Sequence, residues 1–272
     1  MNNSTSKVNL YVNGLQVADD TVSISPWDVS NSTTNLLMGT YGKTLEFLNG
    51  LIDQVRIYNY ARTPAQIAWD YNKGKPVAWY KFNECQGVTT NNSVSTAAYN
   101  GAISIGSSGT QSQLGTCAIG TGSTAAWGNG STGKYGGSLN FDGTDDYVSV
   151  GTGSSANSVS FWAKPTSNTA SMVQLATGIG VTASSGVITA PGFTSPTIYV
   201  NGIPGSTLTA DTWQMITVTS ATAVNASAIK FGLVGSTYYS GQMDEIKIWN
   251  YPLTSVQVKT EYNQGSAVRF SE

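Results

Sequence analysis

Residues 241–265 read GQMDEIKIWNYPLTSVQVKTEYNQG, and residues 50–74 carry a second version of this stretch, GLIDQVRIYNYARTPAQIAWDYNKG. Ten of the 25 positions are identical at a constant offset of 191 residues, and several others exchange Val for Ile, Arg for Lys or Asp for Glu. The run IYVNG at 198–202 also resembles LYVNG at 10–14. Self-similarity at a fixed offset indicates a tandem repeat of whole domains.

This repeat divides the chain into a partial domain at 1–74, a complete domain at 75–265 and the opening strand of a further repeat at 266–272. The partial domain carries an apolar strand face without the strands that would cover it, and such a face does not fold alone in water. We therefore expect strands of a neighbouring repeat, or of another copy of the chain, to complete it. The alternative is an excised piece of a longer array.

The composition bounds the class of protein. The chain has 272 residues, of which 40% are hydrophobic and only 10% are charged. A surface rich in Ser, Thr, Asn and Gly is common on extracellular adhesive and fibrous proteins. The net charge of −2 gives no electrostatic case for nucleic acid binding. The sequence contains no apolar run near 18 residues, so we expect no membrane insertion.

The two cysteines, Cys85 and Cys117, both fall in the complete domain. They lie 32 positions apart, and the chain has no His, so the spacing matches no common zinc site. We expect a disulfide, which implies an oxidising, extracytoplasmic setting. The alternative is a pair of free thiols in a reducing compartment.

Short runs rich in β-branched and aromatic residues recur along the chain, and Gly, Asn, Ser, Asp or Pro separates most of them. This pattern predicts an all-β sandwich of antiparallel strands. Two short helices are also expected, one at the end of each repeat. Thr63 is a candidate N-cap before Pro64, Gly74 can end that helix, and Thr254 to Gly265 repeats the pattern.

Several of these runs together resemble a known family. They are WYKFNE (79–84), GKYGGSLNFDGTDDYVSV (133–150), SVSFWAK (158–164), YVNG (199–202) and GQMDEIKIWNYPLT (241–254). Their order resembles that of the laminin-G-like, concanavalin-A-like lectin domain, especially the copies strung in tandem in large bacterial surface proteins. The resemblance implies an antiparallel two-sheet jelly roll. It does not imply one function, because members bind glycans or proteins, or act as spacers.

The run FDGTDDY holds Asp142, Asp145 and Asp146, whose carboxylates are ligands of the kind that Ca²⁺ prefers. The alternative is a hairpin turn, in which Asp-Gly is favoured for its backbone geometry. In the resembled family a structural calcium, when present, bridges the opening strand, a turn after it and an Asp on the closing strand. The resemblance therefore implies a structural Ca²⁺ at the matching positions, which are Asn83, Glu84, Asp142, Gly143 and Asp244.

The tryptophans fall into two groups. Those on predicted strands are expected in the core: Trp79, Trp162, Trp213 and Trp249. Trp27 and Trp127 lie in loop-like segments and are the candidate ligand-binding aromatics, since exposed rings stack on sugars. Loop tryptophans can equally pack beneath a loop.

We expect no enzymatic activity, because the chain lacks His, has five Glu and shows no paired carboxylates spaced along one strand. Asp244 and Glu245 are adjacent, so a regular strand would point them to opposite faces.

The function expected is that of a structural or adhesive extracellular protein, a segment or subunit of a tandem-domain cell-surface adhesin or filament. The alternative is a calcium-dependent carbohydrate-binding lectin module. The partners expected are other copies of the chain or neighbouring repeats, and surface glycans.

Overall fold

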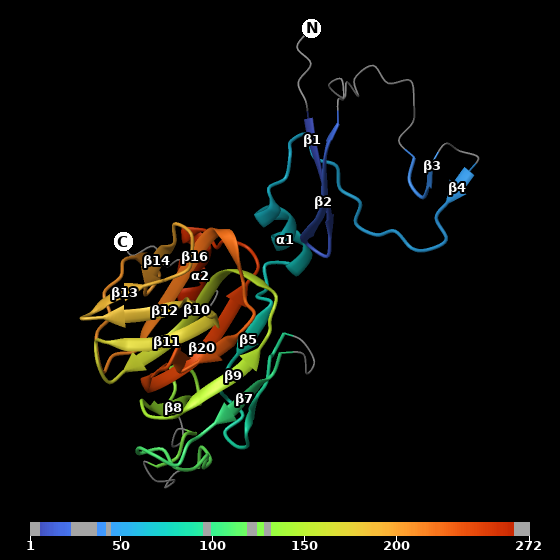
Figure 1. Cartoon of the computed structure of the whole chain (residues 1–272). Coiled ribbons are helices and arrows are strands. Elements are labelled where there is room, and N and C mark those ends of the chain that lie inside the picture. The colour runs from blue at the N-terminus through green and yellow to red at the C-terminus, as the bar shows by residue number, and fades with distance from the viewer. Residues whose placement is uncertain are drawn as a thin grey trace, which may run out of the picture. The chain divides into compact units, whose positions relative to one another are not determined.

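The computed structural model describes residues 6–22, 37–41, 45–94, 99–118, 124–127 and 132–263. Two of the expected features, Trp27 and the strand at 266–272, lie outside these residues. The chain divides into two compact units, Met1–Tyr71 and Asn72–Glu272, which are described separately below (Figure 1). No helix within the described ranges is long and apolar enough to cross a bilayer.

The second unit is a sandwich of two antiparallel sheets, as expected for a concanavalin-A-like jelly roll (Figure 1). The strands of the first sheet are β5 (Ala78–Tyr80), β8 (Leu139–Asp142), β10 (Ser155–Pro165), β14 (Thr197–Val200), β15 (Ile203–Pro204), β16 (Gln214–Asn225) and β20 (Ser240–Trp249). Their order is β15–β14–β16–β10–β20–β5, and β8 pairs with β20.

The second sheet has the order β13–β12–β11–β17–β9–β7–β6. Its strands are β6 (Thr89–Thr90), β7 (Gly101–Ser104), β9 (Tyr147–Gly151), β11 (Ala170–Ala176), β12 (Ile179–Ser184), β13 (Val187–Thr189) and β17 (Ile229–Phe231). A small hairpin, β18 (Leu233–Val234) with β19 (Thr237–Tyr238), completes the unit.

The core lies between the two sheets. The alternation expected in the opening strand is present, because Ala78, Tyr80 and Phe82 are all buried in this core. The rings of Tyr80 and Phe82 meet Phe231 of the opposite sheet edge-on, with centroids 5.0 and 6.4 Å apart. Each large side chain buried in this way stabilises the fold by roughly 1.5–3 kcal/mol.

Strand β20 lies between β10 on one side and β5 and β8 on the other, and it contains a β-bulge. Asp244 pairs with Trp162 of β10, whereas Lys247 pairs with Ser160. An advance of three residues along β20 therefore matches an advance of two residues along β10. Glu245 is the residue that adopts a positive φ, at 54°. A bulge of this kind interrupts the strict alternation of faces along a strand.

Both expected helices are present, as α1 (Pro64–Asn72) and α2 (Ser255–Tyr262). Thr254 and Gln257 form a capping box at the start of α2, since each side chain accepts the other residue's backbone N–H. Thr63 and Gln66 exchange the same two hydrogen bonds at α1. Such caps satisfy otherwise unpaired N–H groups of the first turn.

The first unit contains the hairpin of β1 (Ser6–Val12) with β2 (Leu15–Val22), and the short pair β3 (Thr40–Tyr41) with β4 (Leu45–Phe47). Asn13 and Gly14 form the hairpin turn with φ of 52° and 78°, the positive values that an Asn-Gly turn supplies. A Cβ on Gly14 would lie 3.1 Å from the Cβ of Tyr71, so this turn and α1 are in close contact.

The second unit builds the same hairpin and helix again. Asn201 and Gly202, between β14 and β15, have φ of 52° and 79°. A Cβ on Gly202 would lie 3.1 Å from the Cβ of Tyr262 in α2. The sequence repeat is therefore also a repeat of local structure.

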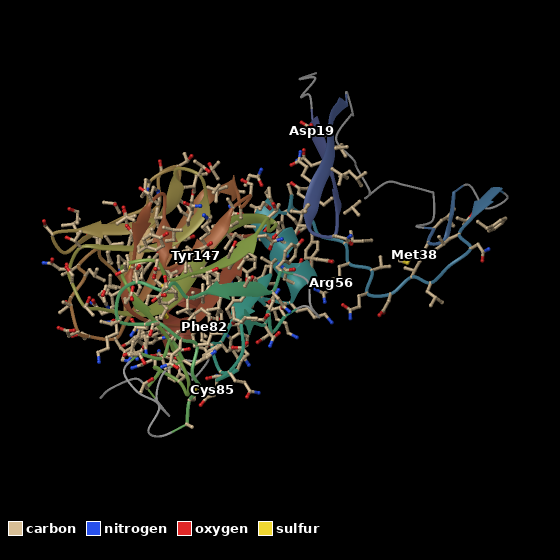
Figure 2. All side chains as sticks on the ribbon, turned by 60° about the horizontal axis from the view of Figure 1, so that its bottom comes forward. Asp19, Met38, Arg56, Phe82, Cys85 and Tyr147 are labelled. Carbon is tan, nitrogen blue, oxygen red and sulfur yellow. A yellow bond between two sulfur atoms is a disulfide. The ribbon has the colours of Figure 1, made fainter. Side chains whose placement is uncertain are left out.

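Residues 51–58 are the counterpart of β20, yet they form no strand with any described residue. Their apolar side chains face solvent, with Leu51 100% and Ile57 72% exposed. Arg56, labelled in Figure 2, belongs to this segment. Since β20 depends on β5, β8 and β10 for its hydrogen bonds, a closing-strand sequence without such neighbours remains open.

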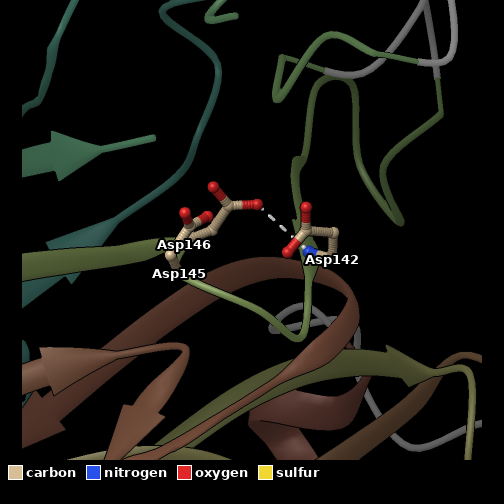
Figure 3. Close-up of side chains that lie close together, drawn as sticks. All are labelled: Asp142, Asp145 and Asp146. Carbon is tan, nitrogen blue, oxygen red and sulfur yellow. Dashed lines mark hydrogen bonds between the residues drawn. The ribbon is translucent and has the colours of Figure 1, made fainter. Parts of the chain in front are cut away.

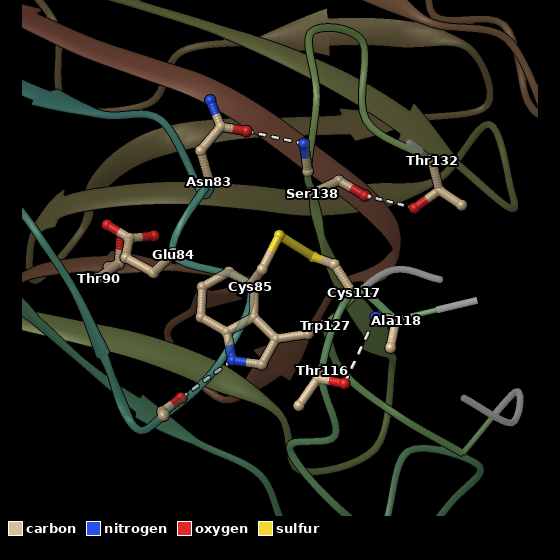
Figure 4. The surroundings of a disulfide bond; sticks show 12 residues. Asn83, Glu84, Cys85, Thr90, Thr116, Cys117, Ala118, Trp127, Thr132 and Ser138 are labelled. Atoms are coloured by element: carbon tan, nitrogen blue, oxygen red, sulfur yellow. Dashed lines mark hydrogen bonds between the residues drawn. A yellow bond between two sulfur atoms is a disulfide. The ribbon is translucent and has the colours of Figure 1, made fainter. Parts of the chain in front are cut away.

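The expected disulfide is present between Cys85 and Cys117 (Figure 4). Their Cα atoms are 4.8 Å apart, and the Cys117 N–H donates to the carbonyl of Cys85 at 3.1 Å. The bond closes a loop over the polar segment 86–116, which contributes β6 and β7 to the second sheet.

The double substitution Cys85→Ala and Cys117→Ala should lower the free energy of unfolding by about 3–4 kcal/mol, because the unfolded chain regains the entropy of an open loop. Urea unfolding followed by tryptophan fluorescence measures this loss. Thiol labelling of both cysteines in the unfolded, unreduced protein would contradict the disulfide.

Candidate functional site

The residues matched to a family calcium site do not gather in one place. Asp142 pairs with Ser240 at the start of β20, and Asp244 lies four residues further on, about 13 Å along the strand. The carboxylate of Glu84 is used locally, since it accepts the N–H of Asn91 at 2.7 Å. Gly143 follows Asp142 in the turn, with φ of 87°. The expected five-residue set is thus spread along the sheet.

Asn83 and Asp244 instead hold a loop. Asn83 Oδ1 accepts the N–H of Gly137 at 2.7 Å, and Asp244 Oδ2 accepts the N–H of Tyr135 at 2.8 Å. Asp244 is fully buried, and its Oδ1 atom has no hydrogen-bond partner among the described residues. Burial, the largest effect, raises the pKa of Asp244 to about 7.

The aspartates of FDGTDDY do come together (Figure 3). Asp142, Asp145 and Asp146 each offer a carboxylate oxygen, and these atoms lie within 4.8 Å of one another. The side chain of Asp146 accepts the N–H of Asp142 at 3.1 Å. Asp146 is buried, and this desolvation raises its pKa to about 6.

Backbone amides of a neighbouring loop already satisfy much of this cluster. Thr110 and Gln111 donate their N–H groups to Asp142 Oδ2 at 2.7 and 3.1 Å, and Ser108 donates to Asp145 Oδ2 at 3.0 Å. The remaining oxygen of Asp145 is buried without a partner in the described part of the chain. The oxygen ligands suit a hard cation such as Ca²⁺, and the same geometry also serves as a loop anchor.

The expectation that Trp127 is an exposed aromatic is wrong. Trp127 is fully buried in the core, and its indole N–H donates to the carbonyl of Gly87 at 2.9 Å (Figure 4). It packs beneath the disulfide-linked insertion, which is the alternative role for a loop tryptophan.

The described residues form a pocket of about 520 Å³ on the face of the first sheet that points away from the core. It is lined by Lys73, Gly74, Lys75, Pro76, Trp79, Tyr135, Ser160, Trp162, Met215, Glu245, Lys247 and Glu261. These residues come from the segment before β5, from β5, β10, β16 and β20, from the loop held by Asp244, and from the end of α2. The volume is within the usual range for small-molecule sites.

Two strand tryptophans belong to this pocket rather than to the core between the sheets. Trp79 is half-buried and donates its indole N–H to Glu245 Oε2 at 2.7 Å. Trp162 is buried, with Tyr135 edge-on to its ring and Tyr262 stacked on it at 5.6 Å. A run of alternating apolar residues does not distinguish a core face from an outer face that a helix and a loop cover.

The expectation that Asp244 and Glu245 point to opposite faces is also wrong. The bulge at Glu245 breaks the alternation, so Asp244 lies opposite Trp162 while Glu245 contacts Trp79, on the same outer face. Burial raises the pKa of Glu245, while Trp79, Lys247 and Lys81 act in the other direction.

Lysines surround the pocket. The ammonium groups of Lys81 and Lys247 lie 4.1 and 4.5 Å from the ring centre of Trp79, and that of Lys134 lies 4.4 Å from the ring centre of Trp162. Lys247 also pairs with Glu261 at 2.7 Å. The pocket thus combines aromatic surface, carboxylate acceptors and ammonium donors.

One family model matches part of the chain. Residues 1–68 match the family model of the concanavalin A-like lectin/glucanases superfamily (Laminin_G_3). This match supports the resemblance seen in the sequence, and it falls on the first unit. No curated protein matches the chain.

Among solved structures, domain 4 of AbnA, an extracellular arabinanase from Geobacillus stearothermophilus in complex with arabinotriose, is 20% identical. It aligns with 68% of this chain and 97% of its own, at a TM-score of 0.39. The receptor-binding domain of botulinum neurotoxin type G is 12% identical, with 70% of this chain and 51% of that chain covered, at a TM-score of 0.42. This chain thus spans about half of that neurotoxin domain. The two antiparallel sheets of the second unit define its fold.

The buried Asp244 should make stability depend on pH. Its pKa is about 7 in the folded state and about 4 in the unfolded state, so between these values the folded protein binds more protons. The free energy of unfolding should therefore fall as pH rises from 4 to 7, by up to about 1.4 kcal/mol per pH unit. Asp146 contributes in the same direction up to pH 6.

Asp244→Asn should flatten this slope, because the amide keeps an oxygen to accept the Tyr135 N–H and cannot ionise. Urea unfolding at a series of pH values measures the change, with the exposed Asp211→Asn as the matched control. An unchanged slope in Asp244→Asn would show that this carboxyl does not carry the effect.

Proposed function

We propose that this chain is a non-catalytic, adhesive part of an extracellular protein in which jelly-roll domains follow one another. The observation that carries the proposal is the duplicated unit, in which an Asn-Gly hairpin turn contacts the tyrosine of a capped helix at Gly14 and Tyr71 and again at Gly202 and Tyr262. Repeated domains are typical of proteins that present binding surfaces at a distance. The disulfide supports an extracellular location.

The proposed domain organisation is a partial repeat at 1–74, a complete repeat at 75–265 and the beginning of another at 266–272. In this organisation residues 49–58 are a closing strand, equivalent to β20. Strands equivalent to β5 and β10, from a neighbouring repeat or another copy of the chain, pair with it. The exposed apolar side chains at Leu51 and Ile57 support the proposal, because a paired closing strand would bury part of this surface.

If another copy supplies these strands, the chain should associate at high concentration, and Ile57→Asp should weaken the association by placing a charge on the pairing strand. Ile203→Asp is a matched control, since Ile203 is 67% exposed and lies on the second unit. Sedimentation velocity over a concentration series measures association. A chain that stays monomeric throughout, or equal effects of both substitutions, would contradict self-completion.

A second candidate is a calcium-dependent carbohydrate-binding lectin module. The pocket on the outer face supports carbohydrate binding, since it places tryptophan and tyrosine rings beside carboxylate and ammonium groups. The cluster of Asp142, Asp145 and Asp146 supports a structural Ca²⁺ at one end of β8 and β9, since its oxygens are close enough to share a cation. Such an ion would fix the turn and the loop at 106–111.

If the aspartate cluster binds Ca²⁺, millimolar Ca²⁺ should raise the melting temperature relative to EGTA, because an ion that binds only the folded state stabilises it. Asp145→Asn should abolish the difference, while Asp211→Asn should keep it. Differential scanning calorimetry makes the comparison. Identical melting of the unsubstituted chain in Ca²⁺ and in EGTA would reject the site.

A further inference from the structure

The charges around the outer-face pocket are unequal. Lys73, Lys75 and Lys247 line it, and Lys81 and Lys134 lie against its two tryptophans. Two glutamates, Glu245 and Glu261, also line the pocket, so three lining lysines face two lining glutamates, with Lys81 and Lys134 close by. The chain as a whole has a net charge of −2, so the pocket is a local concentration of positive charge.

Most of these lysines form no ion pair with a described carboxylate. Lys247 pairs with Glu261, but no ion pair between described residues involves Lys73, Lys75, Lys81 or Lys134. Lys81 and Lys134 instead rest over aromatic rings, which holds their ammonium groups near the pocket, and the charge of Lys81 also acts on Glu245. An anion bound here would be attracted by cations that are already positioned.

The two glutamates retain one oxygen each for a ligand. Glu245 uses Oε2 to accept the Trp79 indole N–H, and Glu261 uses Oε2 for Lys247. Their Oε1 atoms have no hydrogen-bond partner in the described part of the chain. The hydroxyl of Ser160 accepts from Thr217 at 2.9 Å, so its own proton can be donated to a ligand. Sugar hydroxyls complement such a set of acceptors and donors.

We propose that this pocket binds a short acidic oligosaccharide of the hexuronate class. Its carboxylates are attracted by Lys73 and Lys75, which line the pocket, and by Lys81 and Lys134 beside the two tryptophans, and its hydroxyls pair with Glu245 and Glu261. The inference rests on the proposed carbohydrate-binding function. It adds that the sugar is negatively charged and names the residues that recognise this charge. A charged sugar gains from the lysines, whereas a neutral sugar of the same shape does not.

The experiment uses the full chain in isothermal titration calorimetry with oligogalacturonate and with its methyl ester, which has the same backbone without the charges. We expect the acid to bind at least tenfold more tightly than the ester, with an affinity that falls as NaCl increases. Lys134→Gln and Lys81→Gln should each weaken binding of the acid several-fold.

Matched controls separate charge from folding. Lys259→Gln changes an exposed lysine of α2 that neither lines the pocket nor lies over its tryptophans, and it should leave the affinity unchanged. Lys134→Arg keeps the charge and should retain most of the binding, and melting temperatures report whether each variant is folded.

The outcomes distinguish two failures. Equal binding of the acid and the ester, insensitive to salt and to Lys134→Gln, would overturn the inference of an acidic ligand while the carbohydrate-binding proposal stands. No binding of either sugar, nor of any member of an array of acidic and neutral glycans, would overturn both.

Discussion

Strand β20 hydrogen-bonds to β10 along one edge and to β5 and β8 along the other, so it connects the beginning, the middle and the end of the second unit. Its core-facing side chains, including Met243, Ile246 and Ile248, are buried against the second sheet. The polar residues of its other face are positioned by the same pairing. Without these neighbours the same kind of sequence, at residues 51–58, leaves its apolar side chains in solvent.

The bulge in β20 explains how one strand contributes side chains both to the core and to the pocket on the outer face. One extra residue at Glu245 lets Asp244 hold the loop at 134–137 while Glu245 contacts Trp79 across the pocket. Asp244 loses hydration without gaining an ion pair, which is a cost that the rest of the sheet must offset. Local strain and buried charge of this kind are often found beside functional sites.

Much of the fold could be predicted from the sequence, because its signals are local. The capping boxes at Thr63 and Thr254 mark both helices, and the alternation from Ala78 to Phe82 identifies the opening strand of the core. The spacing of the two cysteines and the absence of His favoured the disulfide over a metal site. The caps and the strand alternation depend only on residues close together in the sequence. The disulfide was favoured because the chain lacks the residues of a zinc site.

The site could not be predicted to the same extent, because it depends on contacts between distant segments. Only the register between β10 and β20 reveals the bulge that brings Asp244 and Glu245 to one face. Trp79 was expected in the core and lies half-buried at the pocket, whereas Trp127 was expected to be exposed and is buried in the core. The burial of a ring depends on the segment that covers it. The calcium positions taken from the family resemblance assumed that Asp142 and Asp244 approach each other, and the pairing of β8 with β20 separates them.

Hydrogen exchange measured by mass spectrometry on the dilute chain tests the role of the closing strand most directly. Peptides from 241–253 should exchange slowly, at a rate set by opening of the whole sandwich, whereas peptides from 50–62 should exchange almost as fast as an unfolded chain. Equal, strong protection of the two peptides would contradict this account, because it would mean that the closing-strand sequence of the first unit is structured without its β5 and β10 equivalents.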